Sequence, residues 1–83
     1  MRYTVVWAPA AQNALADIWT QTSARKAVAD AADEIDRLLR RDPLSRGEEQ
    51  GTRRRLVVEP LEVLFTVSPD DRLVQVEQVS ELP

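Results

Sequence analysis

Residues 54–79 read RRLVVEPLEVLFTVSPDDRLVQVEQV, and this stretch decides the fold class of the chain. Three runs within it, residues 54–58, 61–67 and 72–79, are rich in the β-branched and other apolar residues that favour strands. The second run alternates apolar and polar side chains, as a strand with one buried face does. Ser-Pro-Asp-Asp at 68–71 is typical of a type I turn, with proline at its second position. The stretch therefore predicts three consecutive strands of an antiparallel sheet.

The segment before these strands carries the strongest helical signal in the chain. Apolar side chains recur there at three- and four-residue intervals, which is the spacing of one helix face. These side chains are Ala24, Ala27, Val28, Ala31, Ile35, Leu38 and Leu39. On the opposite side, the spacing predicts two i,i+4 ion pairs, Asp33–Arg37 and Asp36–Arg40.

The N-terminal part supplies a strand and a first helix. Residues 2–7, RYTVVW, are β-branched and aromatic and predict a strand. Pro9 then suits the first turn of a helix. The helix is indicated by apolar residues at helical spacing, namely Ala11, Ala14, Leu15, Ile18 and Trp19. The polar residues 20–23 interrupt it, and Thr22 or Ser23 is expected to cap the second helix.

Together these elements predict one α+β domain over residues 1–83, in the order β-α-α-β-β-β. The alanines allow close approach, so the two helices are expected to form an antiparallel hairpin that covers one face of an antiparallel sheet. Asp42-Pro43 ends the second helix. Residues 44–52 hold both glycines and no periodicity, which predicts a loop. Trp7 and Trp19 are expected to fill the space between sheet and helices.

The composition removes several classes of site. The chain has no cysteine and no histidine, so disulfides, thiolate nucleophiles and the commonest zinc ligands are excluded. We therefore predict no metal and no cofactor. The N-terminus lacks the apolar core of a signal peptide, and no apolar run approaches the roughly 20 residues that cross a bilayer. These features indicate a cytoplasmic protein without a membrane partner.

Basic residues are concentrated in the middle of an acidic chain. The net charge is −3, with 14 acidic and 11 basic residues, yet residues 37–55 contain seven basic and three acidic residues. Arg53, Arg54 and Arg55 enter the first strand of the C-terminal stretch. Because guanidinium groups match phosphate oxygens, these arginines are candidates for an anion- or RNA-binding site.

Strand alternation separates the three arginines. Arg54 shares a face with Leu56 and Val58, whereas Arg55 shares the other face with Val57 and Glu59. If the Leu56 face meets the helices, Arg55 looks outward together with Arg53 and is the better functional candidate. The alternative is that the cluster is solvated or paired with carboxylates, which would be Glu48, Glu49 or Glu59.

The order and spacing of these motifs resemble the RelE/ParE toxins of bacterial toxin–antitoxin pairs. The resemblance spans nearly the whole chain through WAPAAQNALADIW at 7–19, AADEIDRLLRRDP at 31–43 and the arginine-led strands at 54–79. It implies one of two activities, because RelE-like members cut mRNA in the ribosomal A site and ParE-like members poison DNA gyrase. It also implies an antitoxin partner, which would add an extended or helical segment to an apolar groove beside the sheet or the helical hairpin.

The resemblance points to Arg53, Arg55 and Glu62 as candidate catalytic residues, with two departures. RelE-like nucleases usually carry an arginine where this chain has Leu61-Glu62, so Glu62 reverses the charge near the scissile phosphate. They also tend to place histidine or tyrosine after the last strand, where residues 80–83 offer only Glu81 as an acid. The leading expectation is therefore an antitoxin-binding toxin. The alternatives are a ribosome-dependent endoribonuclease with an altered site, a gyrase inhibitor, and an antitoxin-binding remnant without toxicity.

Overall fold

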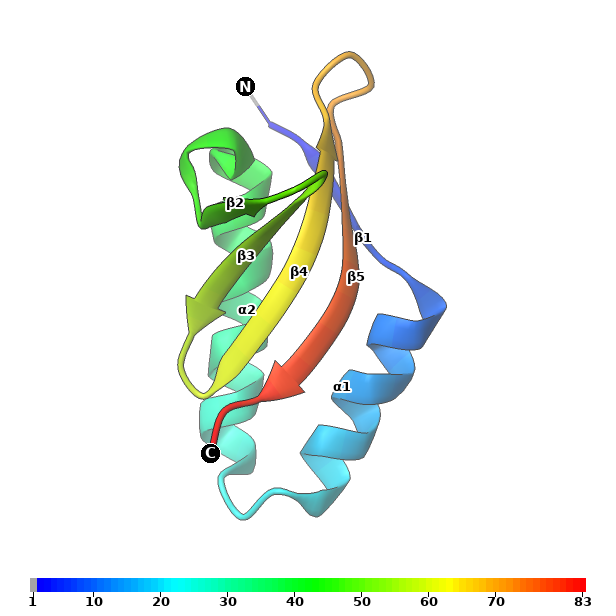
Figure 1. Ribbon diagram of the computed structural model, residues 1–83. Coiled ribbons are helices and arrows are strands. Elements are labelled where there is room, and N and C mark those ends of the chain that lie inside the picture. Colours follow the sequence, from blue (N-terminus) through cyan, green and yellow to red (C-terminus); the bar gives the residue numbers. More distant parts are fainter. Residues whose placement is uncertain (1) are drawn as a thin grey trace.

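The computed structural model describes residues 2–83, which form a mixed sheet with two helices packed on it (Figure 1). The strands are β1 (Thr4–Trp7), β2 (Glu48–Gln50), β3 (Arg53–Val58), β4 (Leu61–Ser68) and β5 (Leu73–Glu81). The helices are α1 (Pro9–Gln21) and α2 (Arg25–Arg41), and a 3-10 turn at Pro43–Ser45 follows α2. The sheet order within residues 2–83 is β1-β5-β4-β3-β2. The α+β fold class and the order of its main elements are confirmed.

Two features of the sheet differ from the sequence-based expectation. β1 pairs with β5 in parallel, so the sheet is mixed, while the pairs β2–β3, β3–β4 and β4–β5 are antiparallel. Part of the expected loop at 44–52 forms the short strand β2, whose Glu49 lies opposite Arg54. Both differences depend on pairing between segments, which the residue pattern of one segment does not specify.

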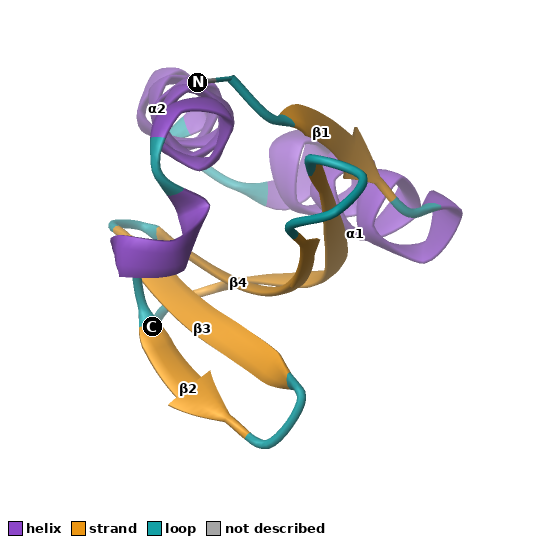
Figure 2. Ribbon diagram, turned by 90° about the horizontal axis from the view of Figure 1, so that it is seen from above, coloured by secondary structure: helices purple, strands orange, loops and turns teal. Residues whose placement is uncertain are grey.

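The core lies between β4, its neighbouring strands and α2. Leu61, Val63 and Phe65 alternate along β4 and are fully buried. The face of α2 that meets them presents Val28, Ala31, Ile35 and Leu39, all buried. In Figure 1, α2 lies behind β3 and β4, and α1 lies beside β5. Figure 2 shows the same layers from above, with the β2–β3 ribbon extending away from the helices.

The link between the helices is joined to the end of the sheet. Ala24 precedes the first residue of α2 and makes no side-chain cap there, so the expected Thr22 or Ser23 cap is wrong. The Thr22 hydroxyl instead accepts a hydrogen bond from the Ala24 N–H and donates one to the Glu81 carboxylate at 2.8 Å. This contact fixes the turn of the helical hairpin against the end of β5.

One of the two expected ion pairs on α2 forms. Arg40 contacts Asp36 at 2.9 Å, as the i,i+4 spacing predicts. The expected Asp33–Arg37 pair is wrong, because Arg37 donates both hydrogen bonds of its side chain to Glu34, one turn away at i,i+3. Glu34 competes successfully because i,i+3 neighbours are as close on a helix surface as i,i+4 neighbours. Within residues 2–83, no helix is long and apolar enough to span a membrane.

Two glycines with left-handed backbone angles flank β2, and they give a test of how β2 is held. Gly47 has φ of +73°, and a Cβ there would overlap the carbonyl oxygen of Arg55 on β3. Gly51 has φ of +66°, and beyond its own residue and its two chain neighbours no described atom lies within 4 Å of the position that a Cβ would occupy there. We expect Gly51→Ala to cost about 1–2 kcal/mol through its backbone angle alone. Gly47→Ala should cost clearly more, because β2 must also move away from β3.

Urea unfolding of the two glycine variants, measured by circular dichroism, compares these costs directly. Equal losses in the free energy of unfolding would contradict the close contact between Gly47 and β3.

Candidate functional site

The arginines of β3 point to both faces of the sheet. Arg54 lies opposite Phe65 on the side of the core, and Arg55 lies opposite Leu64 on the outer side. Leu56, on the same side as Arg54, is buried. The register therefore confirms the prediction that Arg55 lies on the side of the sheet opposite Leu56, which is the side away from α2.

Each of the three guanidinium groups contacts a carboxylate. The pairs are Arg53–Glu77 at 3.0 Å, Arg54–Glu49 at 3.1 Å and Arg55–Glu62 at 2.8 Å. Arg54 also donates to the backbone carbonyl of Arg46 at 3.0 Å. Among the carboxylates expected from the sequence, Glu49 is an ion-pair partner, whereas Glu62 and Glu77 come from β4 and β5. The arginines of β3 thus form three separate ion pairs, with carboxylates from β2, β4 and β5.

A bulge in β5 accompanies the contact of Glu77 with Arg53. Phe65 on β4 pairs with Val76, but the preceding Leu64 pairs with Gln78, so Glu77 is the extra residue on β5. A bulge turns side chains from the regular alternation and increases the local twist. This irregularity places the Glu77 carboxylate within reach of Arg53, two strands away.

The Arg55–Glu62 pair changes the pKa of both of its members. The hydrogen bond from Arg55 lowers the pKa of the Glu62 carboxyl below its ordinary value. The same hydrogen bond, and then the charge of Glu62, raise the pKa of Arg55, with a smaller contribution from Glu48. The two side chains are 34% and 24% exposed, respectively. A phosphate that approached Arg55 would therefore have to displace a carboxylate that already occupies its donors.

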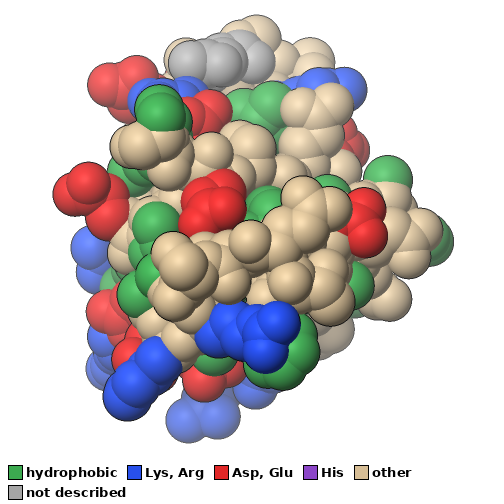
Figure 3. Space-filling view, turned by 90° about the horizontal axis from the view of Figure 1, so that it is seen from below, with side chains coloured by type: hydrophobic (Ala, Val, Ile, Leu, Met, Phe, Trp, Pro, Cys, Tyr) green, Lys and Arg blue, Asp and Glu red, His purple; other side chains and the backbone are tan. Residues whose placement is uncertain are grey.

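The recess beside the Arg55–Glu62 pair is lined by carboxylates. A small hollow of about 210 Å³ between α1 and the outer side of β4 and β5 is lined by Glu62, Glu77, Gln78 and Ser80, with Ala10, Ala14, Leu64 and Val79. Carboxylates repel an anion, so this recess does not favour phosphate. On the face seen from below, acidic and basic side chains lie interspersed (Figure 3).

The end of β5 is held away from the arginines. The Leu82 N–H donates to the Pro60 carbonyl at 2.8 Å, beside the β3–β4 turn. Glu81, the acid expected after the last strand, accepts the hydrogen bond of Thr22. Arg53, Arg55 and Glu62 therefore share the outer side of the sheet, while Glu81 does not join them. Within residues 2–83, no three side chains that could hold a metal ion come together.

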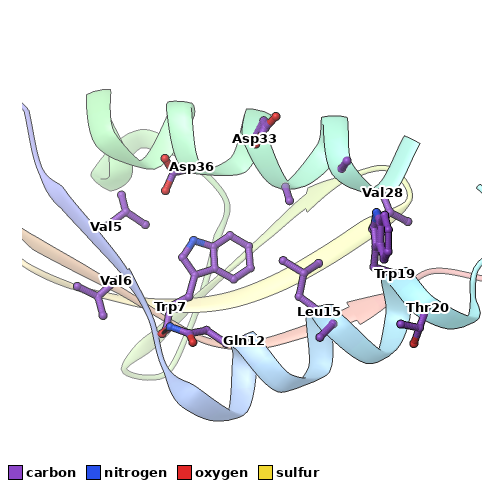
Figure 4. Close-up of a pocket in the computed structure, with 13 residues that line it drawn as sticks. Val5, Val6, Trp7, Gln12, Leu15, Trp19, Thr20, Val28, Asp33 and Asp36 are labelled. Carbon is purple, nitrogen blue, oxygen red and sulfur yellow. Dashed lines mark hydrogen bonds between the residues drawn. The ribbon is translucent and has the colours of Figure 1, made fainter. Parts of the chain in front are cut away.

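A larger opening lies between β1, α1 and α2, and we call it the β1–α1–α2 groove. Its volume is about 870 Å³, and most of its lining is apolar (Figure 4). The lining residues are Val5, Val6, Trp7, Gln12, Leu15, Ala16, Trp19, Thr20, Val28, Ala29, Ala32, Asp33 and Asp36. Val6 is 44% exposed and Trp19 is 45% exposed. An open apolar surface of this kind is typical of a place where another molecule binds.

The groove revises two sequence-based expectations. Trp7 packs against the core as expected, but Trp19 does not fill the space between sheet and helices. The Arg25 guanidinium lies 4.9 Å from the centre of the Trp19 ring. Ala31 of the expected helix contact is buried in the core, Ala24 and Ala27 are exposed, and two other alanines, Ala16 and Ala29, line the open space between the helices. Ala16 and Ala29 lie outside the apolar stripes recognised in the sequence, so those stripes gave no signal for the groove.

Solved structures share this arrangement from end to end. A chain of the RelBE2 toxin–antitoxin complex of Mycobacterium tuberculosis matches with a TM-score of 0.77 and 15% identity, covering 98% of this chain and 92% of that one. A chain of the chromosomal ParDE system of P. aeruginosa matches with a TM-score of 0.74 and 19% identity, covering 99% and 98%. The isolated E. coli RelE toxin matches with a TM-score of 0.61 and 10% identity, covering 98% and 85%.

The fold is that of the RelE/ParE toxins. Sequence comparison adds nothing to this assignment, since no family model matches the chain and no curated protein sequence matches it. At such identities the likeness concerns the backbone, so the side chains of this RelE/ParE fold must be interpreted from their own contacts.

The pKa of Glu62 gives a test of the Arg55–Glu62 pair. A carboxyl whose pKa is lowered by folding stabilises the fold above its ordinary pKa, and the contribution is lost as the pH falls through the lowered value. Wild-type protein should therefore exceed Glu62→Gln in free energy of unfolding at neutral pH. The difference should shrink as the pH falls below about 4.5, the ordinary value for this carboxyl.

Denaturant unfolding of both proteins between pH 7 and pH 3 measures this difference. The control is the same substitution in an Arg55→Gln background, where Glu62→Gln should lose most of its pH-dependent effect. An unchanged pH dependence in that background would show that Arg55 is not the partner of Glu62 in solution.

Proposed function

We propose that this chain is the toxin component of a toxin–antitoxin pair, and that a segment of its antitoxin binds in the β1–α1–α2 groove. The observation that carries the proposal is the groove itself, which leaves Val6 and Trp19 exposed in a domain of the RelE/ParE fold. Similar structures include chains from toxin–antitoxin complexes, and the agreement covers nearly the full length of this chain.

The groove offers a partner substantial hydrophobic stabilisation. Completely burying a side chain such as Val or Leu contributes about 1.5–3 kcal/mol, and aromatic side chains bury more area. A partner that covers Val6 and Trp19 would gain part of this stabilisation, because nearly half of the surface of each residue is exposed. The groove has an open, apolar form that suits a peptide segment inserted along it, which is a common mode of recognition.

The cellular effect that we propose is growth inhibition through translation or gyrase. Binding to a target protein would not need a free cation, and the paired arginines of β3 are compatible with such a mechanism. An antitoxin that covers the groove would then compete with the target or hold the toxin in an inactive complex.

A second candidate function is ribosome-dependent cleavage of mRNA. One observation favours it, because Arg55 and Glu62 lie 2.8 Å apart on a partly exposed side of the sheet. A carboxylate could accept the proton of a ribose 2′-hydroxyl, and a guanidinium could stabilise the charge that develops on the phosphate. Both groups would first have to separate from each other, and we rank this function second for that reason.

The groove makes a prediction about antitoxin binding. Ala29 is exposed and lines the groove, so Ala29→Arg should fill part of it without disturbing the core. Ala27 is exposed on the same helix but does not line the groove. We expect Ala29→Arg to remain folded and toxic yet to lose rescue by the antitoxin, whereas Ala27→Arg should be rescued like wild type.

The measurement is growth of a bacterial host that expresses each variant, with a candidate antitoxin, sought as a short reading frame that adjoins the gene, supplied from a second promoter. Co-purification of the two chains provides the binding readout. Equal rescue of both variants would exclude the groove as the antitoxin site. Wild-type protein that is folded, soluble and harmless would exclude the toxin function and leave an antitoxin-binding remnant.

A separate prediction concerns cleavage. Because each arginine of β3 is already paired, purified protein added to ribosomes on a defined message should produce no codon-phased 5′ ends. Gyrase supercoiling is then the next assay for the same preparation. Codon-phased cuts that disappear in Arg53→Ala/Arg55→Ala but persist in Arg41→Ala would instead establish the ribonuclease.

A further inference from the structure

The β1–α1–α2 groove has one charged wall. The charged side chains among its lining residues are Asp33 and Asp36, and both belong to α2. Figure 4 shows them along the α2 side, with Asp36 near Val5 and Trp7. The polar side chains that α1 contributes to the lining, Gln12 and Thr20, are uncharged. The groove therefore combines an apolar floor with an acidic rim on one side.

The two aspartates differ in what they contact. Asp36 forms an ion pair with Arg40 at 2.9 Å. Asp33 is exposed and takes part in no ion pair or side-chain hydrogen bond with the residues that the structure describes. Its expected partner, Arg37, contacts Glu34 instead. Asp33 thus presents an available carboxylate at the rim of an apolar groove.

We propose that the groove selects a basic amphipathic segment, whose apolar side chains cover the floor and whose lysine or arginine pairs with Asp33. The inference rests on the proposed function, since the segment would belong to the antitoxin. Charge complementarity carries it, because an acidic segment in the same position would face Asp33 and Asp36 without compensation. The net charge of −3 adds a long-range attraction for a cationic partner.

The arginines near the groove do not reverse this preference. A neighbouring hollow on α2 is lined by Arg2, Arg37, Arg40 and Arg41 together with the same two aspartates. Arg37 and Arg40 are already paired with Glu34 and Asp36, which reduces the positive potential that they offer. An acidic segment that reaches toward Arg2 and Arg41 is the competing occupant, and the experiment distinguishes it.

The chain carries its own reporter for this experiment. Its two tryptophans are Trp7 and Trp19, and both line the groove, so tryptophan fluorescence responds to an occupant. The probes are three synthetic amphipathic helical peptides without tryptophan. They have the same leucine stripe, and their polar positions are all lysine, all glutamine or all glutamate. Titration into the purified full chain gives a dissociation constant for each peptide.

We expect the lysine peptide to bind most tightly and the glutamate peptide least tightly. Asp33→Lys should reduce the preference for lysine over glutamate about three-fold or more, which is the order of one partly exposed ion pair replaced by repulsion. The control is Asp70→Lys in the β4–β5 turn, which changes the net charge equally at a residue that does not line the groove. Its preference should stay close to wild type.

Three results of the peptide titrations would each overturn the inference. These are equal or tighter binding of the glutamate peptide, an Asp33→Lys effect no larger than that of Asp70→Lys, and unchanged fluorescence with all three peptides. The growth assay separates this inference from the proposed function. If rescue is lost in Ala29→Arg but kept in Asp33→Lys, the charge preference is wrong while the groove remains the antitoxin site. If the lysine peptide binds preferentially but the chain is not toxic, the selectivity of the groove is supported and the proposed toxin function is wrong.

Discussion

The pairing register of β4 is the constraint on which the other features depend. Leu61, Val63 and Phe65 must face α2, because they form the centre of the core. The period of two then fixes Glu62 on the outer side, opposite Val57, which lies two residues along β3 from Arg55. A slip of one residue would move Glu62 into the core and expose Phe65. The Arg55–Glu62 contact is therefore a consequence of burying the apolar face of β4.

The outer side of the sheet and the groove differ in how many of their groups are free to contact a ligand. On the outer side, arginines from β3 contact carboxylates from β4 and β5, so the charges are satisfied within the fold. In the groove, Val6 and Trp19 remain exposed and Asp33 has no described partner. A ligand gains more binding free energy from groups that have no partner in the fold, since at paired groups it must first replace an existing interaction. This contrast favours the groove over the arginines as the principal binding surface.

The parts of the fold that could be predicted from the sequence depend on local periodicity. The alternation of residues 61–67 and the apolar stripe of residues 24–39 gave the strand and the helix, and the alternation of Arg54 and Arg55 gave their faces. The parallel pairing of β1 with β5, the bulge at Glu77 and the choice of Glu34 by Arg37 depend on which segments meet. The residue pattern of a single segment does not specify these contacts between segments. The groove was not predicted for a separate reason, because alanine is compatible with close packing as well as with open space.

The open groove also links binding to stability. A domain of 83 residues buries a comparatively small fraction of its surface, so each apolar side chain left exposed matters. A partner that binds only the folded chain stabilises it in proportion to the logarithm of its concentration over its dissociation constant. The proposed antitoxin segment would thus complete the apolar layer between β1, α1 and α2 that this chain leaves open. Asp33, at the rim, would contribute little to that stabilisation through one exposed ion pair, yet it would decide which segments can enter. Apolar burial would then determine how strongly a partner is held, and the rim charge would determine which partner it is.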